Sequence, residues 1–179
     1  MDFTQLLEAR RSIRAFDGTK KVTSAQIEVL LKAAQEAPSW KNSETGRYYC
    51  VTSAETLAKL AEDCLPAFNV NSSRGAALIV TTFVANRAGF NKATGEADNE
   101  GGNGWGYYDL GLQNANFILK ARELGLDTLI MGIRDGEKLR QLLEIPETEL
   151  IGPVIALGYR AKEAVRPPRQ PLAEIAKFY

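Results

Sequence analysis

The chain of 179 residues is 45% hydrophobic and balances 22 lysines and arginines against 22 aspartates and glutamates. It is long enough for one domain, residues 1–179, and its zero net charge gives no global attraction to nucleic acid or to an anionic membrane. The absence of histidine excludes the usual zinc sites and the Ser-His and Cys-His nucleophile pairs. No apolar stretch is long enough to span a membrane and no secretory signal is evident, so a cytoplasmic protein is expected.

Two helices are predicted near the N-terminus. Apolar residues at helical spacing predict a helix over residues 2–11 whose apolar face is buried. Thr23, with Gln26 three residues later, forms a capping box that begins a second helix, and Pro38 ends it.

The middle of the chain predicts two strands and a long excursion. Residues 47–53 and 77–84 have the composition of strands, the second of them mostly apolar, and Ser53 is expected to cap a short helix between them. Residues 86–106 are polar and rich in glycine, which predicts a mobile lid or excursion. The two cysteines, Cys50 and Cys64, form no Cys-x-x-Cys unit and are expected as reduced core residues.

The second half predicts a central helix, two buried strands and an extended arm. The helix, residues 108–124, is apolar nearly all round, and strands follow at 127–132 and 153–159, with a helix starting at Asp135 between them. From Arg160 onward three prolines keep the chain extended until a last short helical piece. The sheet should therefore contain at least four strands.

Two segments carry candidate binding groups. The run RRSIR places three arginines and Ser12 within five residues, which suits bidentate binding of a phosphate but equally suits a solvated helix end whose cations complement the helix dipole. The turn at residues 37–49 is dense in polar groups, which ordinary turn chemistry also explains. The run GGNGWG matches neither a dinucleotide fingerprint nor a P-loop and is interpreted as flexible.

Taken in order, five pieces of the sequence closely resemble the FMN-dependent nitroreductase family. They are ARRSIRAF, APSWKNSETGRYYCV, the block from DLGLQNANF to DTLIMG, IPETELIGPVIALGYR and RPPRQPLAEI, and together they cover nearly the whole chain. The resemblance implies an α+β fold with a mostly antiparallel central sheet flanked by helices. It also implies an intertwined homodimer, and we expect the arm from Arg160 onward to lie on the partner chain.

By position, the resemblance implies a set of FMN-binding residues and no catalytic side chain or metal. The phosphate is expected on the RRSIR segment, with Arg169 of the arm as the first choice to complete the site and Arg166 as the second. The flavin ring is expected against a Pro-Ser-x-x-Asn turn, often of the partner subunit, an asparagine before the second strand, and backbone after the strand that follows the central helix. The residues are Arg10, Arg11, Ser12 and Arg14 for the phosphate, and Pro38, Ser39, Asn42, Asn71 (with Asn69 as competitor), Met131 and Gly132 for the ring.

The implied activity is transfer of electrons from NAD(P)H through FMN to a small acceptor such as a nitroaromatic or a quinone, by a ping-pong mechanism. Because amino-acid side chains cannot store a hydride, a redox protein without histidine needs such a cofactor. Residues 44–46 depart from the family's usual continuation after the turn, which leaves the substrate open. The alternatives are a flavoenzyme of the same fold with other chemistry (dehalogenation, flavin fragmentation or oxidation of a peptide-derived substrate) and a protein that stores or senses FMN without turnover.

Overall fold

A computed structural model describes all residues, 1–179. Its four strands are β1 (Gly46–Val51), β2 (Ala77–Val84), β3 (Asp127–Met131) and β4 (Glu149–Gly158). Its helices are α1 (Phe3–Ala9), α2 (Ser24–Gln35), the 3₁₀ turn η1 (Trp40–Asn42), α3 (Ala54–Cys64), α4 (Ala67–Ser73), α5 (Gly104–Glu123), α6 (Gly136–Leu143) and α7 (Leu172–Ile175).

The strands form one sheet in the order β1-β2-β4-β3, and every neighbouring pair is antiparallel. The α+β architecture expected from the sequence is therefore confirmed. The order leaves β1 and β3 as the outermost strands, and an outermost strand can pair with a further segment along its outer side.

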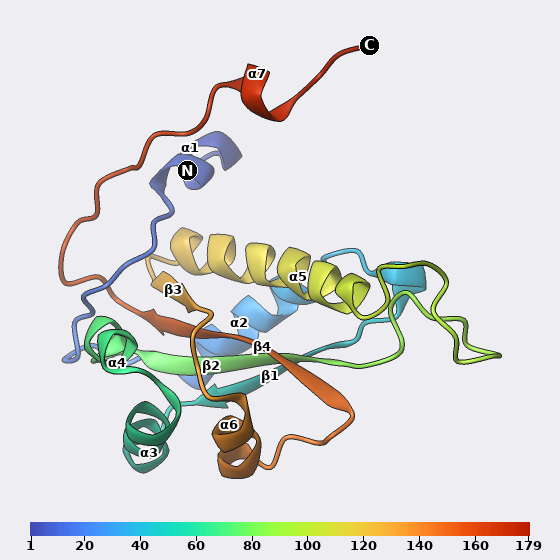
Figure 1. The fold of residues 1–179 in the computed structure, drawn as a ribbon. Coiled ribbons are helices and arrows are strands. Elements are labelled where there is room, and N and C mark those ends of the chain that lie inside the picture. Colours follow the sequence, from blue (N-terminus) through green and yellow to red (C-terminus); the bar gives the residue numbers. More distant parts are fainter.

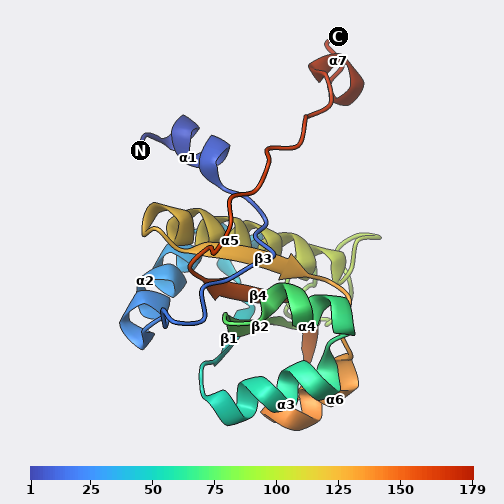
Figure 2. The same cartoon turned by 90° about the vertical axis from the view of Figure 1, so that its left-hand side faces the viewer.

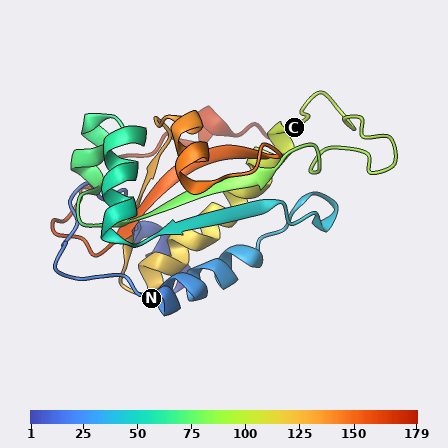
Figure 3. The same ribbon diagram turned by 90° about the horizontal axis from the view of Figure 1, so that it is seen from below.

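Helices cover both faces of the sheet, with α5 on one side and α3 and α6 on the other (Figure 1). Along β2, Leu78 and Val80 point into the core with α3 and α6, whereas Ile79 points into a second core with α2 and α5, as the period of two along a strand requires. Figure 3 shows α2 and α5 running side by side beneath the sheet. Burial on both faces explains why β2 is apolar except for Thr81 and Thr82, whose hydroxyls are hydrogen-bonded.

Two segments stand away from this sandwich. Helix α1 and the arm that ends in α7 extend beyond the α5 layer (Figure 2). The prediction that the apolar face of the first helix is buried is wrong for the single chain, since Phe3 is 66% exposed and Leu7 is 48% exposed. The capping box of Asp2 forms at the start of the helix, and α1 contacts α5, but the same chain leaves Phe3 and Leu7 exposed.

Several other boundaries differ from the sequence predictions. Helix α5 begins at Gly104, earlier than predicted, because its first turn, Gly-Trp-Gly, carries no helix signal. Strand β4 begins at Glu149 and continues through Pro153, which lies in the register shift between the pairs Val80–Val154 and Thr82–Ile151, where a missing N–H is tolerated. Helix α4 was not predicted, because its asparagines and serines are weak helix formers.

The expectation for the cysteines is half right. Cys64 is buried, whereas Cys50 is exposed, and both are free thiols. Cys50 is exposed because it lies on edge strand β1. No helix of the structure is both long enough and apolar enough to cross a membrane.

Candidate functional site

The segment RRSIR is held against edge strand β3. The Ile13 amide donates a hydrogen bond of 3.0 Å to the Thr128 carbonyl, and Ser12 bridges Thr128 in parallel. Ile13 is buried, whereas Ser12 and Arg14 on either side of it are exposed. This alternation, typical of an extended chain, turns the neighbours of Ile13 outward along the edge of the sheet.

The C-terminal arm leaves the sheet beside the same segment. Phe16 forms an antiparallel bridge with Arg160, and the Ala161 amide donates to the Ala15 carbonyl at 2.9 Å. Together the two segments enclose a cavity of about 510 Å³, called here the arginine pocket. It is lined by Arg10, Arg11, Ser12, Arg14, Ala164, Val165, Pro167 and Arg169.

The arginine pocket concentrates positive charge without a counter-ion. None of its four arginines has a carboxylate within salt-bridge distance, whereas Arg166, just outside, pairs with Glu8 at 3.1 Å. The pKa of Arg11 is lowered, first by desolvation and then by repulsion from neighbouring arginines, Arg166 foremost. Guanidiniums brought together in this way, next to the Ser12 hydroxyl, suit bidentate binding of a phosphate.

A buried ion pair fixes the point at which the arm departs. The Asp127 side chain is 1% exposed and accepts hydrogen bonds of 2.7 and 2.6 Å from Arg160 and of 3.2 Å from Arg122. These bonds raise the pKa of Arg160. Sequence reasoning missed this network, although an aspartate at the start of an apolar strand was a usable sign that a cation would be buried beside it.

The other end of β3 presents backbone and apolar surface. Met131 is buried, while Ile130 is 46% exposed and Gly132 is open to solvent. Gly132 lies four residues beyond Thr128, which is about 13 Å along an extended strand. A ligand with its anion in the arginine pocket could therefore extend along this edge to Met131 and Gly132.

The two candidate asparagines occupy different environments on α4. Asn69 is buried, and its amide donates a hydrogen bond of 2.8 Å to the carbonyl of Ile133, directly after Gly132. Asn71 is exposed and accepts only a long bond of 3.5 Å from Arg74. The geometry thus brings Asn69 to the end of β3, whereas Asn71, the first choice from the sequence, points elsewhere.

The turn after α2 is organised by its own hydrogen bonds. Ser39 Oγ accepts from the Glu44 amide at 3.1 Å, and the Asn42 amide group donates to Glu44 Oε1 at 2.9 Å. Pro38 is exposed. No residue of this turn lines the arginine pocket.

Helix α5 separates the turn from the arginine pocket. The Trp40 amide donates a hydrogen bond of 2.9 Å to Asp109, near the start of α5, whereas Arg122 near its end bonds Asp127. Thirteen residues of helix span about 20 Å. Within one chain, then, the structure gathers the phosphate candidates but leaves the turn far from them.

The same turn fastens the excursion of residues 86–103, which projects from the end of the sheet (Figures 1 and 3). Trp40 packs against Trp105 with ring centroids 4.7 Å apart, and Lys41 pairs with Asp98 at 2.8 Å. The Trp105 indole in turn donates to Asn99 at 2.8 Å. The excursion exists as predicted, and its mobility stays a prediction.

The antiparallel α+β sandwich, with the arginine pocket at its edge, limits the class of protein, and sequence comparison specifies it. Residues 7–159 match the Nitroreductase family. The chain therefore belongs to the nitroreductase family, a family of oxidoreductases, and the resemblance found in the sequence is confirmed.

The similarity to known relatives extends over most or all of the chain. A protein of Archaeoglobus fulgidus, provisionally named NADH dehydrogenase/NAD(P)H nitroreductase, is 29% identical over 89% of this chain and 86% of its own length. A nitroreductase family protein of Streptococcus pneumoniae shares the fold with a TM-score of 0.82 at 21% identity, over 99% of this chain and all of that one. A provisionally named nitroreductase of Exiguobacterium sibiricum, solved in complex with FMN, has a TM-score of 0.80 at 23% identity, over 100% of this chain and 98% of that one.

Proposed function

We propose that this chain binds FMN and passes electrons from NAD(P)H to small acceptors such as nitroaromatics or quinones. The observation that carries the proposal is the arginine pocket, in which residues more than 150 positions apart in the sequence bring together four guanidiniums without a carboxylate. FMN ends in a phosphate monoester, the anion that such a pocket suits. The FMN complex of the relative from Exiguobacterium sibiricum supports the same cofactor.

In this proposal the phosphate is bound by the arginine pocket and the ring lies along the outer end of β3. Arg10, Arg11, Ser12 and Arg14 bind the phosphate from one side and Arg169 from the arm. The backbone at Met131 and Gly132 and the exposed side chain of Ile130 provide an edge for the ring. When bound there, FMN would supply the capacity to store a hydride that the side chains lack.

A second copy of the chain completes the site. Pro38, Ser39 and Asn42 lie near the start of α5, whereas the arginine pocket lies toward its end, where Arg122 is about 20 Å along the helix from Asp109. We infer that this turn contacts the ring bound by the partner in a homodimer. The exposed apolar residues of α1 and of the arm offer the surface for such an assembly: Phe3, Leu7, Val165, Leu172, Ile175 and Phe178.

The first experiment identifies the cofactor. The purified protein is expected to be yellow and to release FMN, not FAD, into the supernatant after denaturation, as measured by chromatography. Release of FAD, or failure to take up FMN on reconstitution, contradicts the proposal.

The second experiment identifies the reaction. Oxidation of NADH and NADPH is measured with menadione and with a nitrofuran, and parallel double-reciprocal plots are expected because one flavin serves the donor and the acceptor in turn. Intersecting lines would instead mean that both substrates bind together. A yellow protein without turnover would indicate FMN storage or sensing, and turnover with other substrates alone would indicate another chemistry on this fold.

A further inference from the structure

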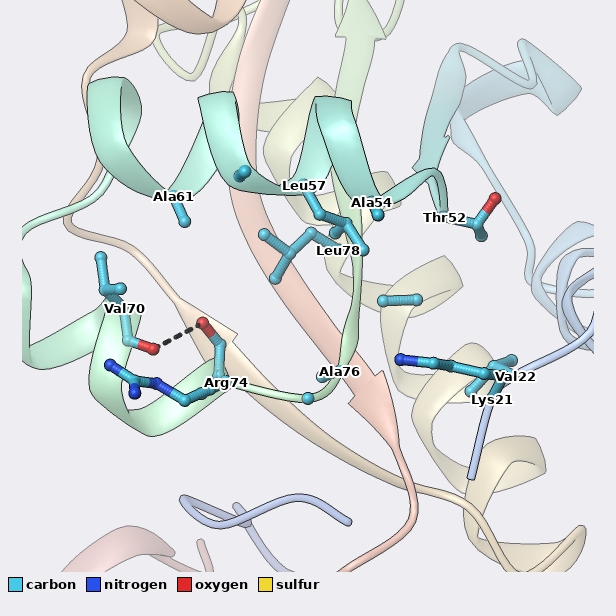
Figure 4. A pocket seen from close by; sticks show the side chains of 14 residues that line it. Lys21, Val22, Thr52, Ala54, Leu57, Ala61, Val70, Arg74, Ala76 and Leu78 are labelled. Carbon is cyan, nitrogen blue, oxygen red and sulfur yellow. Dashed lines mark hydrogen bonds between the residues drawn. The ribbon is translucent and has the colours of Figure 1, made fainter. Parts of the chain in front are cut away.

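A second cavity lies at the other side of the sheet, away from β3. It occupies about 530 Å³ between α3, α4 and the start of β2, and nine of its 14 lining residues are hydrophobic. Figure 4 shows Leu57 and Ala61 of α3, Val70 of α4 and Leu78 of β2 facing this space. A volume in this range and a mainly apolar lining are typical of sites for small organic molecules.

The polar groups of this cavity are cationic or neutral. Lys21 reaches from the segment before α2 toward the start of β2, and Arg74 lies on the opposite wall, where the chain leaves α4 (Figure 4). Neither forms an ion pair, and the one hydrogen bond of Arg74 is that of 3.5 Å to Asn71. Thr52 adds a hydroxyl at the end of β1, and no acidic residue lines the cavity.

The neighbouring Lys20 differs from Lys21 in having an acidic partner. Lys20 pairs with Asp17 at 3.4 Å outside the cavity, although it is the adjacent residue. Only Lys21 extends over the apolar walls. An apolar space with unneutralised cations at its edge complements an anion that carries an apolar body.

We propose that this cavity binds a small monocarboxylate with an alkyl or aryl body, with the carboxylate at Lys21 and the body between α3, α4 and β2. The site is separate from the proposed FMN site. It is built on the β1–β2 half of the sheet, whereas the arginine pocket lies at β3, on the far edge of the order β1-β2-β4-β3. The two sites share no lining residue.

Isothermal titration of the purified, cofactor-loaded protein with octanoate tests the proposal. Binding is expected, and hexanoate, which is two methylenes shorter, should bind about fifteenfold more weakly because each buried methylene contributes about fourfold. Lys21→Met should weaken octanoate binding about tenfold or more, since it removes a charge-assisted contact. The matched variant Lys20→Met should bind octanoate as the wild type does.

A second variant tests the location. Ala61→Phe fills the cavity and should abolish octanoate binding, while the flavin absorbance and NADH oxidation stay at wild-type values. Because Lys21 is exposed, Lys21→Met tests the proposal even where Ala61→Phe lowers stability.

Three outcomes overturn the proposal. If Lys21→Met and the wild type bind octanoate with equal affinity, the carboxylate does not bind at Lys21. If octanoate competes with NADH and Ala61→Phe does not weaken its binding, octanoate binds over the flavin and not in this cavity. The absence of binding in the wild-type dimer means that the cavity takes no carboxylate, or that the arm of a second copy fills it.

Discussion

The sheet sandwich and the C-terminal arm are built from opposite kinds of sequence. β2 and β4 are buried between helices of the same chain, and almost every apolar side chain on them is covered. The arm from Ala164 onward has apolar residues as well, but Val165 is 91% exposed and Phe178 is 95% exposed. The sandwich can therefore be stable alone, whereas the arm needs a surface that its own chain does not provide.

The proposed FMN site joins these two unlike regions. Arg10 to Arg14 are held by β3, through Ile13 and Thr128, and so belong to the sandwich. Arg169 belongs to the arm, where its hydrogen bonds of 3.2 and 3.4 Å reach only the neighbouring prolines. Phosphate binding and assembly of the dimer should for this reason depend on each other.

Deletion of residues 164–179 should have the largest effect. The truncated protein is expected to be monomeric or aggregated and colourless, because the deletion removes both the apolar surface of the arm and Arg169. Size-exclusion chromatography and the absorbance spectrum measure the two losses. A truncated dimer with full FMN occupancy would contradict the arm-exchange model and leave residues 10–14 as the sole phosphate site.

A triple substitution separates the two roles of the arm. Leu172→Asp, Ile175→Asp and Phe178→Asp together keep Arg169 but make the apolar surface acidic. The dimer should be weakened, and FMN should be lost in proportion to the monomer fraction. Full FMN binding by a monomer would show that the second copy contributes nothing to the site.

The next largest effect is expected at the ion pair where the arm leaves the sandwich. Asp127→Ala removes the buried acceptor shared by Arg160 and Arg122, whose side chains are 16% and 22% exposed. It should lower the free energy of unfolding by about 3 kcal/mol, the lower end of the range for a broken buried pair, because Arg160 keeps its pair with Glu163. Asp98→Ala is the matched control, because its pair with Lys41 is partly exposed and should contribute at most about 1 kcal/mol. Urea denaturation measures both, and equal losses would refute the structural role of Asp127.

The contrast between the two regions also explains which parts of the fold could be predicted from the sequence. Periodicity and capping located the sandwich well: Thr23 and Gln26 form the capping box that begins α2, and β2 has the predicted bounds. Periodicity and capping show that a helix has an apolar face, but they do not show what packs against that face. The apolar stripe of α1 therefore predicted burial that the single chain does not provide.

Sequence reasoning could predict the part of the site that lies in one short segment. It could not predict the parts formed by residues that are far apart in the sequence. RRSIR was visible in the sequence, and Arg169 was placed only by family resemblance. The contact of Ile13 with Thr128 and the pairing of Asp127 with Arg160 depend on tertiary approach, which no spacing in the sequence encodes. The choice between Asn69 and Asn71 likewise depends on which face of an unpredicted helix meets residue 133.

Single arginine substitutions should have a moderate effect that differs between the two regions. Arg14→Ala and Arg169→Ala should each weaken FMN binding by about 1.5–3 kcal/mol, roughly tenfold to more than a hundredfold in Kd. Flavin fluorescence during titration of apoprotein measures the Kd. Residue 169 is absent from the truncated protein, so only Arg14→Ala can be tested in that background.

Arg87→Ala is the control for both variants, because Arg87 is an exposed arginine outside the pocket. An equal loss of affinity in this control would mean that net charge, and not the arginine pocket, attracts the phosphate. No loss in either pocket variant would place the phosphate elsewhere.

The smallest effect concerns the link between the turn and the sandwich. Asp109 is buried on α5 and accepts the hydrogen bond from the Trp40 amide. Asp109→Ala leaves that amide without an acceptor and should lower the free energy of unfolding by about 1–2 kcal/mol, measured by urea denaturation. Asp109→Asn keeps an acceptor oxygen at the same place and should cost less.

The pH dependence of these two variants distinguishes the hydrogen bond from the charge. Burial raises the pKa of Asp109 above its ordinary value of 3.8, so between 3.8 and the raised pKa the folded chain holds a proton that the unfolded chain has lost. The contribution of Asp109 to stability must then fall as the pH rises through this window and stay constant above it. Asp109→Asn removes the ionisable group, so the stability of wild type relative to this variant should decline over the same window. A wild-type advantage that grows with pH there would mean that the carboxylate is stabilised in its charged form, and that its bond to Trp40 outweighs the desolvation caused by burial.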